Sequence, residues 1–259
     1  MGQNKKAIEA FENCQQAMSA NKELLSYAIA SGNPDLALDA IEFSQLGFNA
    51  QLWLARLSDN AEDAIYNFEK AIILPKIEND FIVEDFLRWV MAYQYAGNPF
   101  TKNTKSKEII NKGLEKFPDN PDLLFSYILM MDENDIKRLE YMNKILDQEF
   151  SYKPLSFDYS TVYNNIAWTL FLNNKSEEAL PYSETAIKKD SSHDYNWETL
   201  GQIYFSLGRY QDCIDAMSKC IDLSGNKYKT AYELRGKSYR ALGKKKEAAQ
   251  DENKVKTLK

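Results

Sequence analysis

Residues 197–210 of the chain have the sequence WETLGQIYFSLGRY. Its first half carries large and small residues at i, i+3, i+4 and i+7, the spacing of one helix face: Trp197, Leu200, Gly201 and Tyr204. Gly208 interrupts this face and predicts a tight turn. A second apolar stripe at helical spacing starts at Cys213. The stretch therefore predicts the first helix and the turn of a helical hairpin, whose second helix follows directly.

The same order of large and small residues recurs on both sides of this hairpin. An upstream copy, shifted by 34 residues, contains Tyr163, Ile166, Ala167, Leu170, Asn174, Ala179, Ser183 and Ala186. A downstream copy, shifted by 35 residues, contains Tyr232, Gly236, Tyr239, Gly243, Ala248 and Val255. A single hairpin cannot bury both of its faces, so a repeat of this length indicates hairpins stacked in an array. In each hairpin, small residues such as Gly201 and Cys213 are expected to let the two helices approach closely.

The run Trp-x2-Leu-Gly-x2-Tyr-x3-Gly-x-Tyr at 197–210 resembles the tetratricopeptide repeat (TPR) family. The chain departs from the family pattern where Cys213 and Cys220 replace Ala and where Gly225 replaces Pro. The resemblance implies an all-α fold, a right-handed α-α superhelical solenoid. It also implies a protein–protein interaction scaffold or adaptor rather than an enzyme.

Looser copies extend the pattern toward the N-terminus. Ala64, Phe68 and Ala71 form a second-helix signature, whereas GNPFTKNTK at 97–105 predicts a connection about four residues longer than the motif allows. In total we expect about seven TPR-like helical hairpins, plus an unpaired N-terminal helix at Ala7, Phe11 and Cys14. The predicted organisation is one continuous solenoid. Degenerate repeats occupy residues 1–148, a connecting loop 149–157, and three regular repeats with a basic C-terminal cap 158–259.

Composition limits the remaining choices. The net charge is −6, but residues 227–259 hold 11 Lys or Arg against 4 Asp or Glu, a net charge of +7. This basic end is either a solvated cap or a surface for an acidic segment of a partner. No apolar run is long enough to span a membrane, and the three Cys predict buried thiols rather than disulfides. A cytoplasmic location is predicted, with an exported or periplasmic one as the alternative if the chain is a processed or shortened form.

No catalytic motif is found in the sequence, and we predict a chain without enzymatic activity, cofactor or metal. The single histidine, His193, lies in a turn with no second His or Cys at ligand spacing. Nucleic acid is not an expected partner, because most of the chain is acidic and its aromatic residues are needed for packing.

The TPR resemblance also implies where a partner binds. In that family the first helices of successive hairpins line a concave groove. Carried over to this sequence, the groove positions are Asn164, Trp168, Phe171, Glu198, Gln202, Phe205, Glu233, Lys237 and Arg240. The aromatic members favour a site for a peptide or helix, although they are also explained if they pack against one another or against the 149–157 loop. The alternative function is a constitutive structural subunit of a larger complex with no free peptide ligand.

Overall fold

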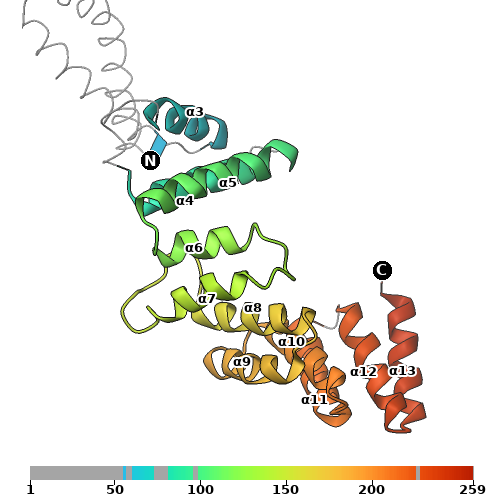
Figure 1. Ribbon diagram of the computed structural model, residues 1–259. Coiled ribbons are helices and arrows are strands. Elements are labelled where there is room, and N and C mark those ends of the chain that lie inside the picture. The colour runs from blue at the N-terminus through green and yellow to red at the C-terminus, as the bar shows by residue number, and fades with distance from the viewer. Residues whose placement is uncertain (1–54, 57–59, 73–80, 96–98, 226–227, 259) are drawn as a thin grey trace, which may run out of the picture. The chain divides into compact units, whose positions relative to one another are not determined.

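The computed structural model describes residues 55–56, 60–72, 81–95, 99–225 and 228–258. Within these ranges the chain forms helices and no strands, which confirms the all-α prediction. The described helices belong to two compact units that divide after Pro118, and each unit is considered by itself (Figure 1). The predicted unpaired helix at Ala7, Phe11 and Cys14 lies outside the described residues, so the number of hairpins stays a prediction.

The first unit contains α3 (Ala61–Ile72), α4 (Val83–Tyr95) and α5 (Pro99–Lys116), and α4 packs against the other two. Ala64, Phe68 and Ala71 are buried on one face of α3, as their helical spacing predicts. The ring of Phe68 stacks on that of Trp89 in α4, with 5.6 Å between centroids. Aromatic stacking thus joins α3 to α4.

The long connection predicted across residues 97–105 is wrong from Pro99 onward, where α5 begins. Proline is favoured at the first position of a helix, because its missing N–H has no partner to lose there and its φ is already helical. The polar residues that follow continue this helix without interruption. The extra residues therefore lengthen α5 instead of forming a loop.

The second unit is a series of helical hairpins, and each helix packs against the next one along the chain. Its helices are α6 (Pro121–Ile128), α7 (Arg138–Leu146), α8 (Tyr159–Leu172), α9 (Ser176–Lys189), α10 (Asp194–Ser206), α11 (Tyr210–Leu223), α12 (Lys229–Ala241) and α13 (Lys245–Thr257). The last six form the three hairpins predicted from the regular repeats (Figure 1).

The turn inside each regular hairpin has the same backbone. Asn174, Gly208 and Gly243 occupy equivalent repeat positions and all have positive φ, at 59°, 71° and 75°. After each of them, the next amide N–H donates to a carbonyl five residues earlier: Lys175 to Leu170 at 3.0 Å, Arg209 to Tyr204 at 2.9 Å and Lys244 to Tyr239 at 2.8 Å. This is the left-handed helix ending that glycine favours, and Asn is the usual substitute for glycine in it.

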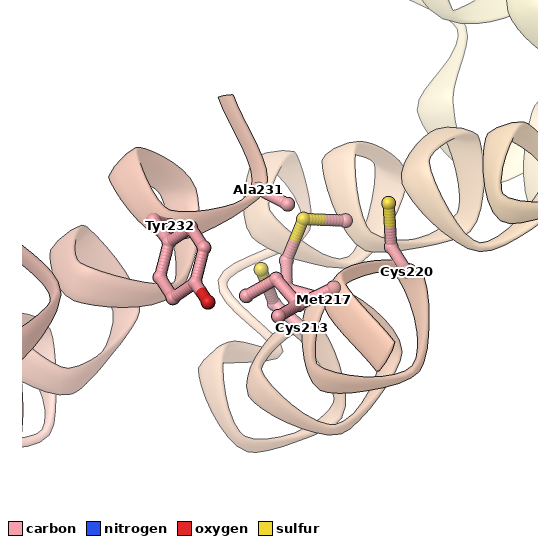
Figure 2. Packing of buried hydrophobic residues seen from close by; sticks show 6 residues of the cluster. Cys213, Met217, Cys220, Ala231 and Tyr232 are labelled. Atoms are coloured by element: carbon pink, nitrogen blue, oxygen red, sulfur yellow. The ribbon is translucent and has the colours of Figure 1, made fainter. Parts of the chain in front are cut away.

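Gly201 lies where α10 and α11 approach closely, as predicted. A Cβ added at Gly201 would lie 2.1 Å from Cε of Met217 and 3.4 Å from Cβ of Ala216, so the Met217 side chain fills the space above the glycine. Cys213 lies in a buried cluster with Met217, Cys220 and Tyr232, where α12 packs on α11 (Figure 2).

Both described cysteines are buried and free, as predicted. Burial raises the pKa of the Cys220 thiol to about 12, and desolvation also raises that of Cys213. A buried thiol that keeps its proton is a poor nucleophile. These cysteines therefore act as small core residues.

The 149–157 segment is irregular and packs within the second unit, where Asp122 anchors it. The Asp122 carboxylate is fully buried and accepts hydrogen bonds from the Tyr152 hydroxyl at 2.6 Å and the Leu155 amide at 3.0 Å. It also accepts from the amide and the hydroxyl of Ser156, each at 2.7 Å. Phe157 stacks on Phe125 of α6, with 4.7 Å between ring centroids. This segment is thus a loop held against α6, whereas the predicted division of the whole chain around it stays a prediction.

Candidate partner-binding surface

The first helices of the regular hairpins form a row. The first helix of the middle hairpin, α10, contacts the first helices of both neighbouring hairpins, α8 and α12. The second helices do not contact one another to the same extent, either α9 with α11 or α11 with α13. Helices on the inner side of a curved stack lie closer together than those on its outer side. The row α8, α10 and α12 (the inner row) is therefore the more closely packed side of this stack, and its helices contain all nine predicted groove positions.

The α8 part of the row presents a stacked aromatic pair. The Trp168 and Phe171 rings lie 5.4 Å apart at an interplanar angle of 28°, and both side chains are half-buried. The Trp168 indole Nε1–H donates a hydrogen bond to Oε2 of Glu133 at 2.8 Å. One turn earlier, Asn164 is only 8% exposed, and its Oδ1 has no hydrogen-bond partner in the structure.

The α10 part is occupied by contacts within the chain. Glu198 accepts hydrogen bonds from Nε2 of Gln202 at 3.1 Å and from the hydroxyl of Tyr228, which immediately precedes α12. Burial, followed by this bond to Glu198, raises the pKa of Tyr228. Phe205 packs edge-on against Tyr210, with 5.5 Å between centroids, and beside the cluster of Figure 2. Packing thus accounts for the aromatic character of Phe205.

The α12 part is charged and solvated. Glu233, Lys237 and Arg240 are all exposed, and Arg240 forms an ion pair with Glu252 of α13. In contrast, Arg235 on the same helix is half-buried and makes a two-bond pair with Asp251, with distances of 2.9 and 2.8 Å. The first set of charges is accessible to a partner, whereas the second joins α12 to α13.

Sequence reasoning missed two residues at this surface, Glu133 and Tyr228. Glu133 lies in the turn between α6 and α7, 35 residues before Trp168, and Tyr228 lies outside the first helices. Each reaches a predicted groove residue from an irregular segment. No helical periodicity marks such positions, so their contacts emerge only from the folded chain.

Within the described residues, no group of three or more His, Cys, Asp or Glu is placed to bind a metal ion. His193 lies 3.4 Å from a carboxylate oxygen of Asp190 and 3.7 Å from one of Asp158, and its ring stacks on Tyr195. These contacts join the turn before α10 to the start of α8. A pocket of about 330 Å³ between α7, α8 and α9 has a mixed lining, with Leu139, Ile166 and Leu170 beside Asn143, Glu178 and Tyr182.

The fold defines a class of helical repeat protein, and the comparisons specify it. Residues 195–227 match the family described as tetratricopeptide repeat. The chain thus carries a TPR, and its all-helical fold is that of a TPR solenoid. No curated protein matches the chain in sequence. No helix within the described ranges has both the length and the apolar character needed to cross a membrane.

Solved TPR structures are similar to this chain in fold. PilW, described as a widely conserved type IV pilus biogenesis factor, has a TM-score of 0.60 at 18% identity, covering 81% of this chain and 92% of that chain. MamA from Desulfovibrio magneticus RS-1 has a TM-score of 0.54 at 15% identity, covering 67% and 92%. YrrB, a TPR protein with an unusual peptide-binding site, has a TM-score of 0.52 at 12% identity, covering 73% and 90%. At these identities the likeness shows a shared fold alone.

Proposed function

We propose that this chain is a non-enzymatic scaffold or adaptor that binds a peptide or helical segment of a partner protein on the inner row α8, α10 and α12. The Trp168–Phe171 pair is the observation that carries this proposal. Neither ring belongs to the buried core, yet the two stack on each other and Glu133 fixes the indole. Rigid, half-exposed aromatic side chains are typical anchors of protein interfaces.

Charge on the last hairpin extends the surface. Lys237 and Arg240 project from α12, within the basic C-terminal region. Such charges attract an acidic segment of a partner and raise its association rate, more than they add to affinity. In this proposal the aromatic pair anchors the partner, the basic end orients it, and the protein acts in the cytoplasm.

The experiment is a capture from cell extract, read by mass spectrometry, with three folded proteins compared. Wild type and the control Leu223→Ala are expected to retain a common partner, whereas Trp168→Ala/Phe171→Ala loses it. Leu223 is a suitable control because it is an exposed apolar residue of the same unit that lies on α11, outside the row. Equal capture by all three proteins contradicts the proposal.

A constitutive structural subunit is the second candidate, and one observation favours it. Phe150 and Leu155 are 101% and 58% exposed on the loop that Asp122 anchors. Exposing apolar side chains on an ordered loop to water is energetically unfavourable, and a second subunit that covers them removes this cost. An isolated chain that self-associates until Phe150→Ala and Leu155→Ala are introduced supports this second function, and a well-behaved wild-type monomer argues against it.

A further inference from the structure

The surface around Trp168 offers aromatic faces and a hydrogen-bond acceptor, the Glu133 carboxylate. Trp168 has already used its single donor on Glu133. A carboxylate has two oxygens and can accept further bonds, and Glu133 itself is exposed. The neighbouring Asn164 is more than nine-tenths buried and its Oδ1 is enclosed, so a partner can reach the rings and Glu133 but not this oxygen.

The α6–α7 turn adds negative charge beside the aromatic pair. It contains Asp132, Glu133 and Asp135, and it is held to the end of α8 by Asn173, whose Nδ2 donates to the carbonyl of Asn134 at 2.9 Å. Glu133 therefore keeps its place beside the Trp168 ring.

The positive charge of Arg138 is not available to a partner. Arg138 is only 2% exposed and donates to the Glu133 carbonyl at 2.9 Å, to Thr169 Oγ1 at 3.2 Å and to Asn165 Oδ1 at 3.0 Å. These hydrogen bonds from Arg138 hold the turn against α8, and desolvation lowers the pKa of the Arg138 guanidinium. The turn itself, residues 129–137, holds three carboxylates and one exposed cation, Lys137, so its net charge is −2.

We infer that the partner segment places a Lys or Arg side chain on the Trp168–Phe171 pair, beside Glu133. This inference rests on the proposed function and names the chemistry that the site recognises. A cation over an aromatic face is attracted by the ring quadrupole, and its N–H groups supply donors that the Glu133 carboxylate accepts. An acidic side chain meets like charge here, and a purely apolar one gives Glu133 no further donor.

The test is a selection from a random octapeptide library displayed on phage. Wild type, Glu133→Gln and Trp168→Ala/Phe171→Ala serve as baits, with Leu223→Ala as the control. Selected peptides are then titrated against their Lys-to-Gln or Arg-to-Gln versions while the Trp168 indole N–H resonance is followed, assigned with Trp168→Phe. This resonance reports the site itself, because its proton lies in the bond to Glu133.

Peptides that bind wild type are expected to be enriched in Lys or Arg, to shift the Trp168 resonance, and to bind about tenfold more weakly after the change to Gln. Glu133→Gln is expected to weaken them several-fold. Peptides that need the aromatic pair but show no basic preference overturn this inference and leave the proposed function standing. Equal enrichment by wild type and Trp168→Ala/Phe171→Ala overturns both.

Discussion

The packing of α10 on α11 predicts a definite cost for Gly201→Leu. Even the first added carbon would lie 2.1 Å from the Met217 methyl and 3.3 Å from its Cγ, and Met217 is fully buried. Overpacking of a tight core contact costs about 3 kcal/mol, whereas replacing glycine inside a helix recovers about 1 kcal/mol. We therefore expect the free energy of unfolding to fall by about 2 kcal/mol. For a unit of this size, the corresponding fall in Tm is about 4–8 °C.

Thermal unfolding followed by circular dichroism measures this effect. Lys219→Leu is the control, because it adds the same side chain at an exposed position of α11 and is expected to change stability by less than about 0.5 kcal/mol. Met217→Ala in the Gly201→Leu background removes the obstructing side chain. The double variant should thus be more stable than the sum of the two single changes predicts, by about 1 kcal/mol or more. An unchanged Tm for Gly201→Leu refutes the assignment of α10 and α11 to one close hairpin.

Two further predictions concern buried groups. Asp122→Ala removes the acceptor of the Leu155 and Ser156 amides, so we expect the free energy of unfolding to fall by about 3 kcal/mol. We also expect faster hydrogen exchange at both amides. If both amides stay protected from exchange, Asp122 does not anchor the loop. The pKa of the Cys220 thiol is about 12 in the folded protein and about 8.5 in the unfolded chain. As pH rises above about 8.5, the unfolded thiol therefore loses its proton first, and the contribution of Cys220 to stability falls between that pH and about 12. Urea unfolding at pH 8 and pH 10 should show a steeper loss for wild type than for Cys220→Ala, and equal losses would mean that the thiol is not buried.

The regular repeats could be predicted because the spacing of their large and small residues determines how the two helices of each hairpin pack. A large residue at one helix position and a small one at the next leave few other ways to pack two helices. The three hairpins from α8 to α13 therefore follow from the sequence. Asn174 could also be assigned to the turn, since it aligns with Gly208 and Gly243 and shares their positive φ.

The irregular segments were not predictable in the same way. Asp122 looks like an ordinary acidic residue in the first turn of α6, and only the return of residues 152–156 makes it a buried anchor. Likewise, helix spacing places Trp168 and Phe205 on the same predicted face of their helices, but it does not show which residues surround each of them. The structure shows that Phe205 packs beside a buried cluster, whereas Trp168 bonds to an exposed carboxylate. Such distinctions depend on contacts between distant residues, which periodicity does not encode.

The shared turn at Asn174, Gly208 and Gly243 has a consequence for how this chain evolves and folds. Each turn is closed by hydrogen bonds that span five residues, so a hairpin can form locally before its neighbours are made. Each hairpin then needs only the adjacent one to complete its burial. A gene segment encoding one such unit can therefore be duplicated or removed without rewriting the rest, and the length of the row of first helices can change by one hairpin at a time.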